Sequence, residues 1–173
     1  MIAELVALRF YTSYSFNSIN IPMRDTQRTT PHPLPGMVTN IQNGMKKLRA
    51  LGLDDASSKQ TVVLWRGMSY IKLPQKFNDE GGTELAPMST TTDVSVAISY
   101  AVKKDTRSAL LFRFVTRNNL ERGADVKWLS MFPGESETLF PPLTFLQRTR
   151  TEPQEVAHNG VKVTIVELST TLA

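Results

Sequence analysis

The spacing of apolar residues divides this chain into a helical first part and a mostly stranded second part. Between residues 37 and 52, apolar side chains recur every three or four positions, which predicts an amphipathic helix. Residues 2–9 predict a shorter helix. Residues 26–36 contain three prolines and a glycine, and they predict a loop between these helices.

The second part contains short β-rich segments separated by polar connections. The first follows a small, polar connection at residues 54–60. We predict strands at residues 61–65, 109–115, 138–140, 144–148 and 161–168. The predicted fold class is therefore α+β, with a helical N-terminal part packed on a β-sandwich in a single domain over residues 1–173.

One further helix is predicted within the stranded part. The hydroxyl residues 89–92 precede Asp93, which is a suitable N-cap for a helix that runs to about Lys103. Its inward face is expected to carry Val94, Ala97, Ile98 and Ala101.

Composition narrows the class of protein. The chain has 173 residues, of which 40% are hydrophobic and 21% charged, as expected for one globular domain. It has no cysteine, so disulfides, thiol nucleophiles and cysteine-based zinc sites are excluded. No apolar run approaches the roughly 20 residues of a membrane span. The start lacks a basic leader, so we expect a cytoplasmic protein, with secretion or delivery as an effector left open.

Charge gives little support for a nucleic-acid partner. The net charge is +4, but the basic residues are scattered, and the densest group (Lys46, Lys47 and Arg49) fits a solvated helix face. His32 and His158 have no acidic or histidine neighbours at ligand spacing. We expect both to lie in loops, and we expect no metal, no nucleic acid and no membrane as partners.

Three distant segments could together form a chemical site. They are Leu64–Met68 with its arginine after an apolar strand, the hydroxyl cluster Met88–Thr92, which is expected to open a helix, and the loop Trp128–Pro142, which is expected to bring two glutamates into a strand. Taken singly, an arginine at the end of a strand is most often a surface cation, and a hydroxyl cluster before a helix is most often a cap. Two glutamates two residues apart are most often a solvated strand edge. Residues i and i+2 of a strand face the same way, about 6 to 7 Å apart, so Glu135 and Glu137 are expected to address one cavity.

In this order, Arg66, Ser89 and Glu137 resemble the arginine–serine–glutamate signature of the mono-ADP-ribosyltransferases. That family includes clostridial binary toxins and the arginine-specific ecto-transferases of vertebrates. The paired glutamates followed by two prolines, and the N-terminal stretch that contains Tyr11, Asn20 and Arg24, also resemble family motifs. The resemblance implies an ADP-ribosyltransferase-like fold and NAD as co-substrate.

The resemblance also implies roles for individual residues. Glu137 would support the ribose cation, Ser89 would hold Glu137, and Glu135 would orient and deprotonate an arginine of a target protein. A glutamate at this first position accompanies arginine targets in the family. Phe132 would contact the target protein. NAD would be bound by Arg66, Gly67, Thr90, Thr91, Tyr11, Asn20 and Arg24.

Chemistry independent of the resemblance fits the same assignment. The sequence has no Gly-x-Gly-x-x-Gly turn for a dinucleotide, and a guanidinium is an alternative clamp for a pyrophosphate. A carboxylate near a developing oxocarbenium ion stabilises it, as in glycosidases. An arginine acceptor, with a pKa above about 12, needs a group that takes its proton.

One departure from the family motif and several alternative functions accompany this resemblance. The chain has Ser89-Thr90-Thr91 where the family most often has Ser-Thr-Ser. Water could replace the acceptor, giving an NAD glycohydrolase, or the fold could serve as a non-catalytic module. Nucleic-acid modification is a weaker alternative.

Three side-chain environments are also expectations. Trp128 is expected to pack beneath the glutamate loop, whereas Tyr100 could stack on the nicotinamide or the adenine of NAD, or pack in the core. Lys103, Lys104 and Arg107 follow the helix where the family has a phosphate–nicotinamide loop, and one of them could contact phosphate.

Overall fold

The computed structural model describes residues 2–52, 59–69, 73–102 and 108–172. Its first part is helical, as predicted, with α1 (Ile2–Tyr11), the short 3-10 helix η1 (Tyr14–Phe16), α2 (Asn17–Arg24) and α3 (Pro35–Leu51). The third helix begins two residues earlier than expected. Its first turn contains Pro35, whose missing N–H has no intrahelical partner at that position and so costs nothing there.

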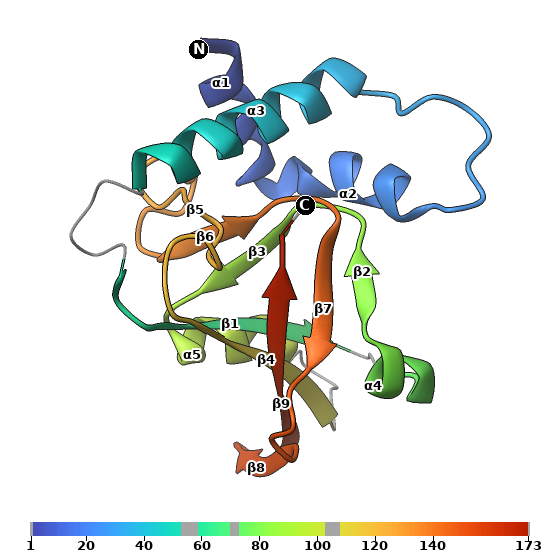
Figure 1. Cartoon of the computed structure of the whole chain (residues 1–173), viewed down its shortest axis with the longest axis vertical. Helices are drawn as coiled ribbons and strands as arrows, with labels where there is room; N and C mark the ends of the chain where they lie inside the picture. The colour runs from blue at the N-terminus through green and yellow to red at the C-terminus, as the bar shows by residue number, and fades with distance from the viewer. Residues whose placement is uncertain (1, 53–58, 70–72, 103–107, 173) are drawn as a thin grey trace.

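The second part is a mixed β-sheet, and the predicted α+β class is confirmed. In the sheet, the strands follow the order β2-β7-β9-β4-β1-β3-β6-β5, and β8 pairs with β9 beside this path. In Figure 1, β1 runs across the view while β7 and β9 run along it, so the sheet is strongly twisted. The strands are β1 (Val62–Ser69), β2 (Gly82–Glu84), β3 (Met88–Thr91), β4 (Ser108–Thr116), β5 (Ala124–Asp125), β6 (Glu137–Phe140), β7 (Thr144–Arg148), β8 (Gln154–His158) and β9 (Val161–Thr171).

Two helices accompany the sheet, α4 (Gln75–Glu80) and α5 (Val94–Ala101). Asp93 caps α5 as predicted, because its carboxylate accepts a hydrogen bond from the backbone N–H of Ser95. The segment before it differs from the expectation. Ser89 to Thr91 lie on strand β3 and do not open the helix, because they pair with β6 along their whole length.

The central strand pairs bury apolar residues on both faces of the sheet. On one face, Leu64, Phe112 and Phe114 belong to a core shared with β6, β7 and β9. On the other face, α5 packs its alanines against β4 and β9. Helix α5 approaches β1 so closely that a Cβ on Gly67 would lie 1.8 Å from the carbonyl oxygen of Ala97. Only glycine fits at this position of β1.

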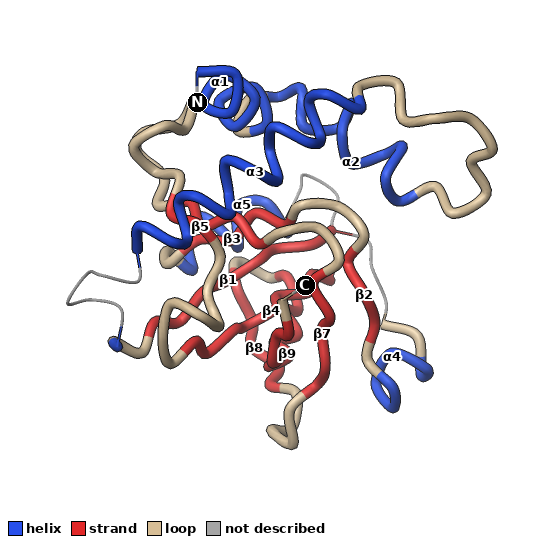
Figure 2. Tube along the Cα trace, turned by 45° about the horizontal axis from the view of Figure 1, so that its top comes forward, coloured by secondary structure: helices blue, strands red, loops and turns tan. Residues whose placement is uncertain are grey.

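The helical part covers the β5–β6 end of the sheet. Figure 2 shows α1, α2 and α3 on one side of the strands. A third core joins Leu8, Ile41 and Met45 from the helices to Val126 and Leu139 from the sheet side. The cleft described below opens beside this junction.

Several expectations from the sequence are wrong. Val94 is 39% exposed and Trp128 is 63% exposed, so neither side chain is packed inside. His32 lies in a loop as expected, but His158 ends strand β8. Helix α5 ends at Ala101, and the lysines and the arginine expected to contact phosphate, at positions 103, 104 and 107, lie outside the described residues, as does most of the connection 54–60.

The described residues contain neither a candidate membrane span nor a candidate metal-binding group. Across residues 2–52, 59–69, 73–102 and 108–172, no helix is both long and apolar enough to cross a bilayer. Over the same ranges, no three histidine, aspartate or glutamate residues are grouped in a way that could hold a metal ion.

Candidate active site

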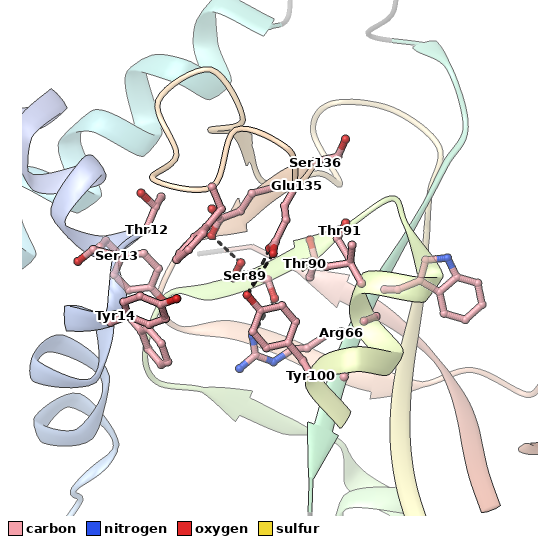
Figure 3. A pocket seen from close by; sticks show the side chains of 18 of the residues that line it. Thr12, Ser13, Tyr14, Arg66, Ser89, Thr90, Thr91, Tyr100, Glu135 and Ser136 are labelled. Atoms are coloured by element: carbon pink, nitrogen blue, oxygen red, sulfur yellow. Dashed lines mark hydrogen bonds between the residues drawn. The ribbon is translucent and has the colours of Figure 1, made fainter. Parts of the chain in front are cut away.

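A cleft brings together nearly all residues that the sequence singled out. It opens between the helical part, strands β1, β3 and β6, and helix α5 (Figure 3). Of the predicted site residues, those that line it are Tyr11, Asn20, Arg66, Gly67, Ser89, Thr90, Thr91, Phe132, Glu135 and Glu137. Arg24 is not among the lining residues.

Glu137 is held by two hydroxyl groups, one on each carboxylate oxygen. Strand pairing places Ser89 of β3 near the start of β6, and the Ser89 hydroxyl donates to Glu137 Oε1 at 2.6 Å. From the preceding loop, the Ser130 hydroxyl donates to Glu137 Oε2 at 3.0 Å. The carboxylate plane is therefore fixed from two separate elements.

The surroundings of Glu137 oppose its ionisation. Burial raises the pKa of Glu137 above its ordinary value, and the negative charge of Glu135 raises it further. The hydrogen bonds from Ser89 and Ser130 lower the pKa in part, because they favour the charged form. The two serines therefore help to keep an anion at this position of the cleft.

Arg66 supplies the positive charge of the cleft. Its Nη1 donates to the backbone carbonyl oxygen of Ser89 at 2.7 Å, which orients the guanidinium beside β3. Burial lowers the pKa of Arg66, although a guanidinium stays protonated in proteins. Within the described residues, no carboxylate forms an ion pair with it. An anionic ligand group would supply the missing countercharge.

Arg24 lies near Arg66 but already has a partner. Its Nε and Nη2 donate to the two carboxylate oxygens of Glu84, each at 2.9 Å. Glu84 Oε1 also accepts a hydrogen bond from the backbone N–H of Ala86. A bidentate pair of this kind neutralises Arg24. A direct role for Arg24 in ligand binding would require this pair to open.

Tyr11 and Asn20 form a buried polar pair at the helical wall of the cleft. The Tyr11 hydroxyl donates to the carbonyl oxygen of Pro87 at 2.6 Å and accepts from Asn20 Nδ2 at 3.0 Å. Burial raises the pKa of Tyr11 to about 12, so its proton stays in place at neutral pH. Asn20 Oδ1 is buried and has no hydrogen-bond partner in the described part of the chain. This unused acceptor is available to a ligand donor.

The remaining residues predicted to bind the cofactor have structural roles in the fold. Gly67 is required by the close approach of α5. The Thr90 hydroxyl donates to the carbonyl oxygen of Thr138 at 2.8 Å, and the Thr91 hydroxyl accepts from the backbone N–H of Asp93 at 3.1 Å. Both threonines thus stabilise β3 and the start of α5, and their role towards NAD stays a prediction.

Glu135 does not share a strand with Glu137, contrary to the expectation. It ends a turn in which its backbone N–H donates to the carbonyl oxygen of Phe132 at 2.9 Å, and β6 begins only at Glu137. Both glutamates nevertheless line the cleft. The Tyr100 hydroxyl of α5 lies 3.3 and 3.5 Å from the two oxygens of Glu135, a long and weak contact.

The same arrangement of strands and helices occurs in solved enzyme structures. The C3 exoenzyme of Clostridium limosum superposes with a TM-score of 0.69 at 17% sequence identity, over 98% of this chain and 86% of that one. Plx2a, an ADP-ribosyltransferase toxin from Paenibacillus larvae, superposes with a TM-score of 0.67 at 16% identity, over 97% and 85% of the two chains. This chain has the ADP-ribosyltransferase fold.

A third structure of this fold, the ADP-ribosyltransferase Vis in complex with agmatine, is 22% identical, with a TM-score of 0.65 over 97% of this chain and 74% of that one. No protein-family model and no curated protein sequence matches this chain. The ADP-ribosyltransferase-like arrangement predicted from the sequence is therefore confirmed at the level of the fold.

Sequence reasoning did not identify Tyr14 and Thr12 as lining residues of this cleft, or Ser130 as a hydrogen-bond partner of Glu137. Tyr14 meets Phe132 edge to face with ring centroids 5.3 Å apart, and both residues line the cleft. The Thr12 hydroxyl accepts a hydrogen bond from the backbone N–H of Met131 at 3.1 Å, and it so connects the glutamate loop (residues 126–136) to the end of α1. These contacts join residues far apart in sequence, and no local pattern announces them.

Of the two environments expected for Tyr100, stacking on a ligand and packing in the core, the second is wrong. Its side chain lines the cleft and is 53% exposed. Figure 3 shows the Tyr100 hydroxyl pointing towards Glu135. Its position beside Glu135 makes it part of the cleft mouth.

Proposed function

We propose that this protein is an ADP-ribosyltransferase that cleaves NAD and transfers ADP-ribose to an arginine of a target protein. The observation that carries the proposal is the hydrogen bond of 2.6 Å from Ser89 to Glu137, in the cleft that Arg66 also lines. It joins an anchored carboxylate and a partly buried cation, which has no carboxylate partner among the described residues, in one pocket. A sugar cation and a pyrophosphate are the two charged groups that cleavage of NAD presents.

Two features of the cleft fit NAD as the substrate. The guanidinium of Arg66 has no carboxylate partner among the described residues and suits a pyrophosphate. The buried Asn20 Oδ1, which lacks a donor in the same part of the chain, suits a hydroxyl or amino group of the dinucleotide. Arg24 would contact the dinucleotide if its pair with Glu84 opened on binding.

In the first step, the bond between C1′ of the ribose and the nicotinamide nitrogen breaks. The electron pair goes to the pyridinium nitrogen, so nicotinamide leaves as a neutral molecule and the sugar carries the positive charge. An ionised Glu137, bonded to a ribose hydroxyl, stabilises that charge. Ser89 and Ser130 keep the carboxylate in orientation while the charge develops.

In the second step, a guanidinium nitrogen of the acceptor arginine attacks C1′. A new carbon–nitrogen bond forms, and a proton leaves the guanidinium for Glu135. Glu135 suits this role because it lines the same cleft and, among the described residues, its carboxylate has only a long hydrogen bond from the Tyr100 hydroxyl. The structure of Vis with agmatine supports a guanidinium acceptor, because agmatine carries the same guanidinium group as arginine.

The test is a reaction with NAD labelled in its ADP-ribose part, with agmatine as acceptor. We expect the wild-type protein to release nicotinamide and to label agmatine, but not an alkyl amine without a guanidinium group. We expect Glu135→Gln to lose agmatine labelling by about 100-fold or more, the usual contribution of a general base, while nicotinamide release continues.

Glu80→Gln is the matched control, because Glu80 is an exposed glutamate of α4 outside the cleft. It should behave as wild type. Nicotinamide release with no labelled acceptor would identify an NAD glycohydrolase instead. A wild-type protein that does not consume NAD at all would contradict the proposal.

A further inference from the structure

The Ser130 hydroxyl lies at the junction between the glutamate loop (residues 126–136) and the proposed catalytic acid. The side chain is buried, with 3% of the residue exposed, and it comes from the loop rather than from the sheet. We propose that Ser130 is a positioning residue that links the conformation of this loop to the orientation and charge of Glu137. The inference rests on the proposed function, in which Glu137 acts as an anion.

The direction of the Ser130 hydrogen bond is fixed by its neighbours. Ser130 Oγ accepts a hydrogen bond from the backbone N–H of Phe132 at 3.1 Å. Since that N–H can only donate, the single hydroxyl hydrogen is free to point at Glu137 Oε2, 3.0 Å away. The serine therefore presents a donor, and not a lone pair, to the carboxylate.

The backbone around Ser130 holds this donor in place. The Ser130 N–H donates to the carbonyl oxygen of Val126 at 2.8 Å, and the Val126 N–H donates to the carbonyl oxygen of Glu137 at 3.0 Å. The loop is thus bonded to Glu137 through both its main chain and its side chain. A movement of Phe132 that breaks its N–H contact removes one of the bonds that hold the Ser130 hydroxyl against Glu137.

Ser89 and Ser130 differ in what they are attached to. Ser89 belongs to β3, which pairs with β6 along its length, so its bond to Glu137 follows from the sheet register. Ser130 belongs to a loop that also carries Phe132 and Glu135, the residues proposed to meet the target protein. The loop can therefore influence the Glu137 carboxylate through Ser130, whereas Ser89 acts on it from the sheet.

Other charged and titratable groups face Glu137 and bear on its titration. Glu135 contributes repulsion from the loop itself. Tyr100 from α5 and Tyr11 from α1 sense the charge of Glu137, and Arg66 from β1 lies against Ser89. None of these groups changes when Ser130 is replaced, so a shift in Glu137 titration reports the serine.

The test compares Ser130→Ala with Ser136→Ala across pH. Ser136 lies in the same loop and lines the cleft, but it makes no hydrogen bond in the described part of the chain. In Ser130→Ala, we expect the acid limb of kcat/KM for NAD cleavage to move up by about one pH unit, because one bond to the charged form is lost. Activity at high pH should largely recover, and Ser130→Thr, which keeps the hydroxyl, should restore the wild-type limb.

Ser136→Ala should leave the limb unchanged. An equal loss of activity at every pH in Ser130→Ala, with the limb unmoved, would show a purely structural role and overturn the proposal. A shift of the same size in Ser136→Ala would also overturn it.

A second measurement does not depend on activity. Carbon NMR of protein labelled at glutamate side chains follows the titration of Glu137 directly, with Glu137→Gln used to assign the signal. A higher pKa in Ser130→Ala supports the link even if NAD turnover is never observed, in which case only the proposed function fails. An unchanged Glu137 titration overturns the link, whatever the enzyme does.

Discussion

The two glutamates of the cleft differ in how firmly the protein holds them. Glu137 receives hydroxyl donors at 2.6 and 3.0 Å, and its partner Ser130 is 3% exposed. Within the described part of the chain, the carboxylate of Glu135 has only the Tyr100 hydroxyl as a partner, at 3.3 and 3.5 Å, and Tyr100 is 53% exposed. One carboxylate is anchored at the start of a paired strand, and the other ends a turn at the cleft mouth.

This difference matches the two halves of the proposed reaction. A charge that supports a developing sugar cation is most effective when it is already oriented before the bond breaks. A group that receives an incoming arginine must meet a partner whose approach varies, so a loosely held carboxylate is suitable. The protein therefore holds the Glu137 carboxylate with short hydrogen bonds and leaves the Glu135 side chain able to adjust to its partner.

Removing the charge of Glu137 should have the largest effect. We expect Glu137→Gln to reduce nicotinamide release and arginine transfer together by about 1,000-fold, as when a strong electrostatic contact to a transition state is lost. The fold should tolerate the change, because the amide retains the shape of the side chain without its unfavourable buried charge. Steady-state rates and a thermal melt test both statements. Transfer that survives while nicotinamide release fails would contradict the division of roles.

Removing Ser89, the closer of the two hydroxyl partners of Glu137, should have the second-largest effect. Ser89→Ala deletes a hydrogen bond to a charged group, worth about 1.5 to 3 kcal/mol, so NAD cleavage should fall by about 10- to 150-fold. The ratio of agmatine labelling to nicotinamide release should stay unchanged, since Glu135 is untouched. A change in that ratio would show that Ser89 serves the acceptor and not the sugar.

The pH dependence should separate activity from stability. Because the pKa of Glu137 is raised, NAD cleavage should decline as pH falls through a range above the ordinary value of 4.5. The folded state binds this proton more tightly than the unfolded state, so the stability contribution of Glu137 is present at low pH and is lost as pH rises through the same range. Melting temperatures of wild type and Glu137→Gln should therefore diverge in favour of the variant as pH rises. Parallel melting curves at all pH values would contradict the raised pKa.

The smallest effect is expected at the loosely held glutamate. Tyr100→Phe removes an exposed and long hydrogen bond, so transfer to agmatine should change by only about two- to three-fold, with nicotinamide release unaffected. The assay is the partition between labelled agmatine and free nicotinamide. A loss as large as that of Ser89→Ala would mean that Glu135 is held as firmly as Glu137.

The sequence predicted the parts of the fold that depend on local periodicity. The long helix near residue 40, the apolar strand β4 and the N-cap at Asp93 all carry such signals. The gathering of Arg66, Ser89 and Glu137 was predicted by resemblance, and strand pairing accounts for it, because β1, β3 and β6 are neighbours in the sheet.

The parts that escaped prediction depend on tertiary contacts. Ser130 is an ordinary loop serine until the loop folds back over Glu137. Trp128 was expected beneath the loop, but the cluster there is filled by Leu129, Val126 and the helical residues, which leaves the indole outside. The hydroxyls of residues 89–92 predicted a helix start because helix caps and strands both use serine and threonine, and only the pairing with β6 distinguishes the two.

The place of β9 in the sheet has a consequence for how the molecule is made. This last strand lies between β4 on one side and β7 and β8 on the other, with β4 aligned in parallel. A nascent chain therefore carries β4 with an unpaired, apolar edge until β9 has been synthesised. We expect a chain synthesised only as far as β4 to be prone to aggregation, since the apolar edge of this strand gains its partner only with β9.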